Sequence, residues 1–226
     1  MKIDKDYKDI KKVDGHYEIQ GDLITNEDVE FDLDNWLLVT GKIETKSIKC
    51  NMYLQAGDGI KAGCGIEAGD GIKAGDGIKA GCGIKAGDGI EAGWGIEAGC
   101  GIEAGDGIKA GDGIEAGWGI EAGWGIEAGD GIKAGCGIEA GWGIEAGLTI
   151  VCKTLFAKLR IFAGIAIYKN TTEEERTITC EELLNGEIAY GKLNLIPKKE
   201  IKKMTVRDIC NELGYDIEII KDGNNE

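Results

Sequence analysis

Three kinds of reactive or adhesive side chain recur at one position of a short repeat. From Ala56 to Glu145 the phrase Ala-Gly-x-Gly-Ile-(Lys/Glu) occurs fifteen times without a gap, and x is only Asp, Cys or Trp. Carboxylates can bind cations or basic groups, thiols can bind soft metals, and exposed indoles are frequent anchors of interfaces. What these side chains do together depends on how the repeat places them.

The composition of the repeat excludes a helix and favours a β-solenoid. Two glycines in six residues would each cost roughly 1 kcal/mol in an α-helix, whereas an isoleucine every six residues is typical of stacked β coils. In the segment Ile-(Lys/Glu)-Ala we expect Ile and Ala to point inward and the charge outward. Gly-x-Gly then forms a corner, where we expect glycine to supply a positive φ. Residue x therefore lies on an outer edge.

The cysteines at position x predict the length of one coil. Cys64, Cys82, Cys100 and Cys136 are separated by 18, 18 and 36 residues. All four share one column if a coil contains three phrases, or 18 residues. We therefore predict an all-β fold, a parallel β-solenoid with triangular 18-residue coils.

The aliphatic residue at every sixth position resembles the hexapeptide-repeat proteins, over about half of the chain. Members of that family form left-handed triangular β-helices, so the resemblance implies a left-handed coil. The chain departs from the family pattern two residues before Ile, where Asp, Cys or Trp replaces a small residue. Many members are acyltransferases, which implies a catalytic histidine and loops between coils. The repeat has neither, because the only histidine is His16, and we expect no enzymatic activity.

The repeat phase divides the chain into four segments. Cys50 and Cys152 take the buried Ala position at the two ends of the regular phase. We also expect a loose lead-in over residues 1–15, and a turn at Asn185-Gly186. The ending that starts at Met204 resembles those of small phage and mobile-element proteins. The predicted segments are an N-terminal lead-in and β cap (1–47), the β-helix (48–152), a C-terminal β cap (153–197) and a small α+β tail with a short helix and a strand (198–226).

Charge and hydropathy limit the partners. The net charge is −15, and the repeat accounts for −10 of it, with 16 acidic residues against 6 lysines. This balance disfavours direct binding to nucleic acid or anionic membrane and favours basic partners, cations or simple solubility. The chain has no run of 18 apolar residues, and its start lacks the apolar core of a signal peptide. We expect a cytoplasmic protein with its eight cysteines reduced.

The acidic and thiol columns have plain explanations beside the functional ones. Asp70, Asp88 and Asp106 would stack, and Ca²⁺ could separate them, although lysines and solvent could screen them equally well. The stacked cysteines could hold a soft metal or cross-link on oxidation. Zinc, however, usually takes four convergent ligands, and no histidine joins them. We expect inert thiols, no metal and no cofactor.

The tryptophans of the repeat are the strongest candidates for a binding surface. Trp94, Trp118, Trp124 and Trp142 would lie at outer corners, with the last two stacked. Exposed indoles among acids are typical of interface anchors. Alternatives are that the C-terminal segment covers them or that they stack on sugars. The predicted binding residues are Trp94, Trp118, Trp124, Trp142, Asp70, Asp88 and Asp106.

Together these features predict a non-enzymatic, acidic β-helical binding protein that uses its carboxylate and tryptophan edges to bind a protein partner. One version is a nucleic-acid mimic that blocks a basic, nucleic-acid-binding protein, such as a host defence factor, by analogy with acidic pentapeptide-repeat helices. Alternatives are a self-assembling structural protein, a small-ligand-binding oligomer and a hexapeptide-type acyltransferase. We expect no direct contact with nucleic acid or membrane, and we leave a homo-oligomer open.

Overall fold

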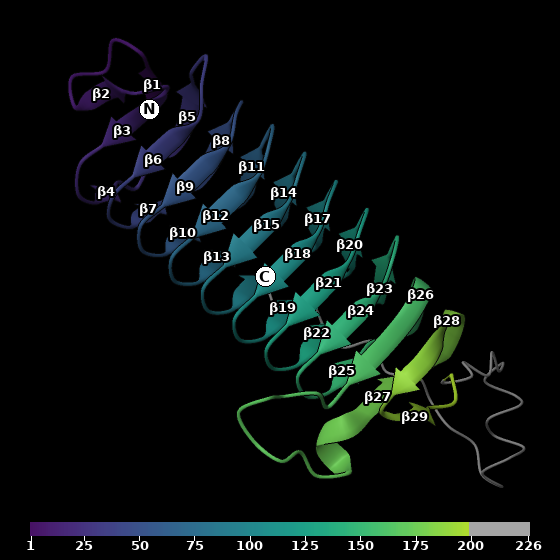
Figure 1. Cartoon of the computed structure of the whole chain (residues 1–226). Coiled ribbons are helices and arrows are strands. Elements are labelled where there is room, and N and C mark those ends of the chain that lie inside the picture. The colour runs from purple at the N-terminus through teal and green to yellow at the C-terminus, as the bar shows by residue number, and fades with distance from the viewer. Residues whose placement is uncertain (199–226) are drawn as a thin grey trace, which may run out of the picture. The chain divides into compact units, whose positions relative to one another are not determined.

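The isoleucine at every sixth residue forms the core of a three-sided rod. The computed structural model describes residues 1–198, in which short parallel strands stack along three faces (Figure 1). Each strand of the repeat pairs with the strand 18 residues further along, so that Ile60 lies beside Ile78, Ile66 beside Ile84 and Ile72 beside Ile90. The predicted all-β fold of parallel 18-residue coils is confirmed, while the left-handed sense stays a prediction.

The first face is a sheet of ten parallel strands. At a spacing of ~4.8 Å these strands extend over roughly 43 Å. They are β4 (Leu23–Ile24), β7 (Ile43–Thr45), β10 (Ile60–Ala62), β13 (Ile78–Ala80), β16 (Ile96–Ala98), β19 (Ile114–Ala116), β22 (Ile132–Ala134), β25 (Ile150–Val151), β27 (Thr177–Cys180) and β29 (Lys192–Leu195).

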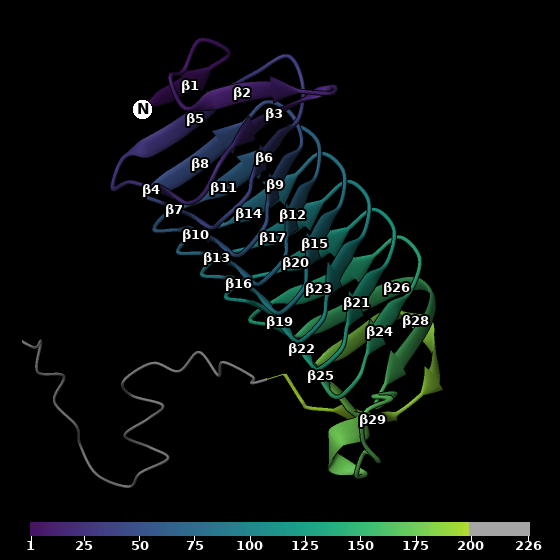
Figure 2. The same cartoon turned by 60° about the vertical axis from the view of Figure 1, so that its left-hand side comes forward.

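The other two faces stack in the same way, and Figure 2 shows the coils following one another along the rod. Both faces end in two long strands, β26 (Thr154–Ala163) and β28 (Glu182–Tyr190), which turn the corner between them. The second face contains β1 (Lys2–Asp4), β5 (Asp28–Asp32), β8 (Ser47–Cys50), β11 (Ile66–Ala68), β14 (Ile84–Ala86), β17 (Ile102–Ala104), β20 (Ile120–Ala122) and β23 (Gly137–Ala140). The third contains β2 (Ile10–Val13), β3 (His16–Ile19), β6 (Leu37–Val39), β9 (Leu54–Ala56), β12 (Ile72–Ala74), β15 (Ile90–Ala92), β18 (Ile108–Ala110), β21 (Ile126–Ala128) and β24 (Ile144–Ala146).

The core has the composition that the period predicts. Every isoleucine of the repeat is buried, and so is every alanine that follows it by two residues. Cys50 and Cys152 are buried in alanine positions, as the phase of the repeat predicts. Because identical side chains lie above one another, the core is a set of isoleucine and alanine columns that run along the rod.

The corner glycines are needed for close stacking and not for a positive φ. No glycine of the repeat has a positive φ, so this expectation was wrong. The first glycine of each corner lies against the carbonyl of the coil before it: a Cβ at Gly99 would lie 2.1 Å from the oxygen of Gly81. The second glycine has more room, since a Cβ at Gly101 would lie 3.4 Å from the oxygen of Gly119. The tight contact along the rod axis selects the first glycine.

The N-terminal segment is more ordered than its charge predicts. Strand β1 pairs in parallel with β5, and β2 pairs antiparallel with β3. Ile3 is fully buried in the core, so the loose lead-in expected over residues 1–15 is corrected. One apolar side chain in a charged segment is sufficient to add a strand to the end of the stack.

The C-terminal coils are parallel throughout. Asn185-Gly186 does not form the expected hairpin turn, because β28 runs through it and pairs in parallel with β26. The Asn185 side-chain amide donates to the carbonyl of Ala157 at 2.8 Å, and Gly186 has φ 122°. These residues form a coil corner at which the chain changes face.

Residues 1–196 form one compact unit. Its only helix within residues 1–198 is one 3₁₀ turn, Glu174–Arg176. Among these described residues, no helix is long and apolar enough to cross a bilayer. The predicted helix and strand after residue 198 lie outside the described residues.

Candidate functional site

One corner of the rod gathers five of the seven predicted binding residues. Backbone hydrogen bonds link each corner residue to the one in the preceding coil: Trp124 N donates to Asp106 O at 3.1 Å, and Trp142 N donates to Trp124 O at 2.9 Å. Leu159 N then donates to Trp142 O at 2.8 Å. The column is Asp70, Asp88, Asp106, Trp124, Trp142 and Leu159. Trp94 and Trp118 lie on the other two corners.

The apolar half of this column is a stacked and exposed surface, which we call the tryptophan edge (Trp124, Trp142 and Leu159). The two indole rings are stacked with centroids 5.7 Å apart and an angle of 13° between their planes. More than half of each side chain of the edge is exposed: 55% for Trp124, 58% for Trp142 and 56% for Leu159. Within residues 1–198 nothing covers the edge. Cover by the C-terminal tail concerns residues outside the described part.

Glutamates lie on both sides of the tryptophan edge. Glu121 and Glu139 each precede one of its tryptophans by three residues on the second face. Glu127 and Glu145 each follow one by three residues on the third face. The Lys109 ammonium donates to Glu127 at 2.8 Å, and this hydrogen bond raises the pKa of Lys109. The other three glutamates make no ion pair with any residue in the described range.

Elsewhere on the repeat the outward charges are largely neutralised by pairing. All six lysines of the repeat form an ion pair with a glutamate of an adjacent coil, at 2.6–3.1 Å. Within residues 1–198, Glu67, Glu121, Glu139 and Glu145 are the glutamates of the repeat without such a pair. Three of these four therefore flank the tryptophan edge, which concentrates uncompensated negative charge there.

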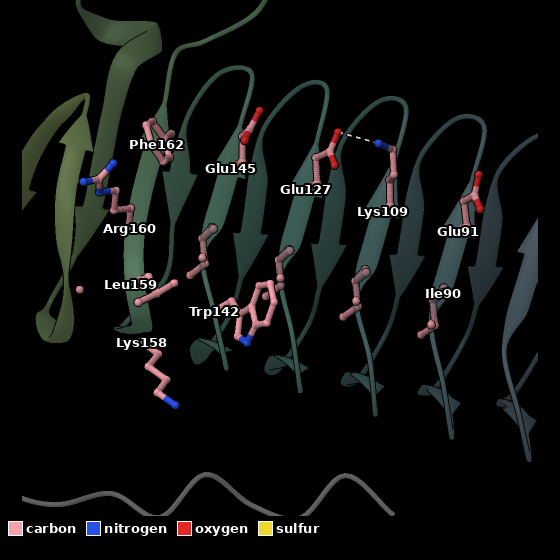
Figure 3. A pocket seen from close by; sticks show the side chains of 18 of the residues that line it. Ile90, Glu91, Lys109, Glu127, Trp142, Glu145, Lys158, Leu159, Arg160 and Phe162 are labelled. Carbon is pink, nitrogen blue, oxygen red and sulfur yellow. Dashed lines mark hydrogen bonds and ion pairs between the residues drawn. The ribbon is translucent and has the colours of Figure 1, made fainter.

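A groove of about 1290 Å³ runs along the third face beside the edge. Figure 3 shows Trp142 at one margin and the row Glu91, Lys109, Glu127 and Glu145 at the other. The floor is backbone of the Gly-Ile segments, which have no outward side chain. Lys158 and Arg160 lie at the C-terminal end, where Arg160 pairs with Glu187 at 3.4 Å. The groove crosses several coils and is open to solvent.

The corner next to the first face is covered near its C-terminal end, in contrast to the tryptophan edge. The loop after β26 lies over it: Gly164 N donates to Leu148 O at 2.8 Å, and Ala166 N donates to Gly147 O at 2.9 Å. The Tyr168 hydroxyl donates to Asp130, and this hydrogen bond raises the pKa of Tyr168 to about 12. The chain thus shields one corner with its own loop and leaves the tryptophan edge open.

The remaining candidates do not assemble into a catalytic or chelating cluster. His16 stacks on Trp36 at 4.2 Å in the N-terminal coils, and its Nε2 lies 3.7 Å from Glu18. Within residues 1–198 no three His, Cys, Asp or Glu side chains converge on a point that could hold a metal ion. Cys64, Cys82 and Cys100 share one corner, as their spacing predicts.

The sequence reasoning missed the part of the site that lies after the repeat. Leu159 and Phe162 belong to β26, which was expected only to close the end of the rod. The signal was present: Leu155-Phe156-Ala157 and Ile161-Phe162-Ala163 repeat the Ile-x-Ala pattern six residues apart. Leu159 precedes Ile161 by two residues and therefore takes position x.

The fold and its corner columns define a parallel β-solenoid built from hexapeptide phrases in 18-residue coils. Comparisons with protein-family models, curated proteins and solved structures find no match to this chain. The function has to be argued from the surface itself.

Proposed function

We propose that this chain is a non-enzymatic binding protein that recognises a basic segment of a protein partner at the tryptophan edge. The observation behind this proposal is the stacked, exposed pair Trp124 and Trp142, flanked by three glutamates without an ion pair. An indole face attracts Arg and Lys side chains by cation–π interaction. Carboxylates bind guanidinium groups through two parallel hydrogen bonds. A surface with both groups fits arginine better than any other side chain.

The groove beside the edge suits an extended segment of the partner. It crosses six coils, from β12 to β26, and therefore runs for roughly 24 Å at the usual strand spacing. About seven residues of extended chain cover that length. Alternating side chains of such a segment would reach Trp142 on one margin and Glu145 on the other, as Figure 3 allows.

The nucleic-acid-mimic version of this function gains less from the geometry. A mimic of a polyanion needs uncompensated charge along its length, whereas most glutamates on the first face and in the N-terminal coils pair with lysines. Free carboxylates remain at the Asp corners, so the version is not removed. An inhibitor of a host defence factor would still need the local basic contact proposed above.

Site-specific photocross-linking tests the proposal in a lysate of the native cell. We would place p-benzoylphenylalanine at Leu159, with the same residue at Trp94 as a matched control on another corner. The proposal predicts cross-links from Leu159 to Lys/Arg-rich segments that disappear in Trp124→Ala/Trp142→Ala. Cross-links to a second copy of this chain would indicate self-assembly instead. Absence of any product specific to Leu159 would contradict the proposal.

A further inference from the structure

A second corner of the rod stacks three cysteines on consecutive coils. Cys82 N donates to Cys64 O at 3.0 Å, and Cys100 N donates to Cys82 O at 3.0 Å. All three thiols are free; Cys82 is exposed, and the other two are half-buried. Each cysteine lies between two glycines, so no neighbouring side chain in its own coil stands between the sulfur and solvent. We call these residues the cysteine column (Cys64, Cys82 and Cys100).

The coil spacing matches a specific mode of metal coordination. Residues stacked in register on adjacent coils lie ~4.8 Å apart. A bond between a metal ion and a thiolate is about 2.3 Å long, so an ion held linearly between two sulfurs needs them roughly 4.6 Å apart. Because the corner backbone is the same in each coil, the three Cα–Cβ bonds are parallel and keep the spacing of the coils.

This arrangement selects the class of ion. Zinc takes four convergent ligands, and no three potential ligands converge anywhere in residues 1–198. Hard cations such as Ca²⁺ prefer oxygen ligands. Soft thiolates favour monovalent ions such as Cu(I), for which two sulfurs form a complete linear ligand set. The expectation of inert thiols came from counting ligands for zinc, and it does not apply to an ion that needs two.

We propose that the cysteine column binds soft monovalent cations, Cu(I) or Ag(I), with each ion bridging the Sγ atoms of two adjacent coils. Two thiols lose two protons to the solvent and form two metal–sulfur bonds for each bridging ion, and no electron is transferred. Cys82, in the middle, takes part in both possible bridges. The inference is independent of the binding function proposed for the tryptophan edge, because that edge occupies a different corner.

Cys136 supplies a matched control. It lies on the same corner and is exposed, but its neighbours are Trp118 in one direction and Lys153 in the other. A thiol there has no second thiol one coil away. Cys136→Ser and Cys82→Ser therefore remove one corner thiol each, and only the second change breaks the column.

The experiment is a competition titration of the reduced, oxygen-free, full-length protein with Cu(I) against a colorimetric Cu(I) chelator. We expect Cys82→Ser to weaken the tightest site by more than the roughly 10–100-fold that loss of an outer-shell partner costs, and Cys136→Ser to leave it unchanged. Circular dichroism checks that both variants fold, and Cys64→Ser/Cys100→Ser, which isolates Cys82, should reproduce the loss. Equal losses in Cys82→Ser and Cys136→Ser, or no loss in either, would overturn the proposal.

Discussion

At the scale of single residues, position in a column decides what a side chain does. Cys50 and Cys152 are buried in the core, whereas Cys82 and Cys136 lie exposed at a corner. Glycine is likewise divided into two classes by the axial contact, although both glycines of a corner look equivalent in sequence. The two predictions that follow test these distinctions.

We expect Gly99→Ala to destabilise the fold and Gly101→Ala to have little effect. The new Cβ at residue 99 would lie 2.1 Å from a backbone oxygen, and such overpacking costs about 3 kcal/mol or more. At residue 101 the contact is 3.4 Å with no positive φ, so the loss of unfolded-state entropy can stabilise by up to ~1 kcal/mol. Chemical denaturation followed by circular dichroism measures both changes. Equal unfolding midpoints would show that the axial contact does not select the first glycine.

Thiol reactivity should separate the two classes of cysteine. Burial raises the pKa of Cys50 to about 11 and that of Cys152 to about 12. Since the thiolate is the reactive form, only about a thousandth of Cys50 is reactive at pH 8. We expect iodoacetamide to label Cys50 and Cys152 at least ~100-fold more slowly than Cys82 and Cys136. Peptide mass spectrometry measures each rate, and rapid labelling of Cys152 in the folded protein would contradict its burial.

The same thiols predict a loss of stability at high pH. A raised pKa means that the folded state holds the proton more tightly than the unfolded chain does. For Cys152 this contribution is complete below pH 9.0, the ordinary value, and is lost as the pH rises toward about 12. We therefore expect the thermal midpoint of the wild type to fall over this range by more than that of Cys152→Ala. Parallel curves would show that Cys152 does not titrate in this way.

At the scale of elements, the strands of the repeat are interchangeable, but the columns are not. Each strand contributes the same buried Ile and Ala, so that any phrase can occupy any face. The tryptophan edge exists only because Trp124 and Trp142 are 18 residues apart. Function on this scaffold therefore depends on the spacing between phrases more than on the phrases themselves.

Two deletions separate the fold from the column. Removing residues 131–136 takes out one phrase and leaves Trp124 and Trp142 on different corners. Removing residues 95–112 takes out one coil and keeps them stacked. We expect both variants to fold, since core and corner are unchanged in kind, and only the second to keep the exciton couplet of the stacked indoles in circular dichroism. A couplet that survives in both variants would contradict the 18-residue coil.

At the scale of the whole molecule, the sequence predicts the scaffold better than the surface. The spacing of Cys64, Cys82 and Cys100 was sufficient for the coil length, because stacking in register is a consequence of a strict period. The glycine contacts were not predictable from φ preferences, since they depend on the distance between coils. The ion pairs depend on which lysine meets which glutamate one coil away. Only the stacked structure showed that three of the unpaired glutamates lie at the tryptophan edge.

The most direct test of the account is the affinity of the tryptophan edge for a defined basic peptide. We would measure fluorescence anisotropy with a labelled peptide of alternating Arg and Gly, against one of alternating Glu and Gly. Trp124→Ala/Trp142→Ala removes two indoles from the edge, and Trp94→Ala/Trp118→Ala removes two from the other corners.

The account predicts that the wild type binds the basic peptide only and that added salt weakens this binding. Loss of the two indoles of the edge should weaken it about 30-fold, or ~2 kcal/mol for two cation–π contacts, whereas the control pair should retain it. Equal affinity of the two double variants for the basic peptide would contradict the central claim.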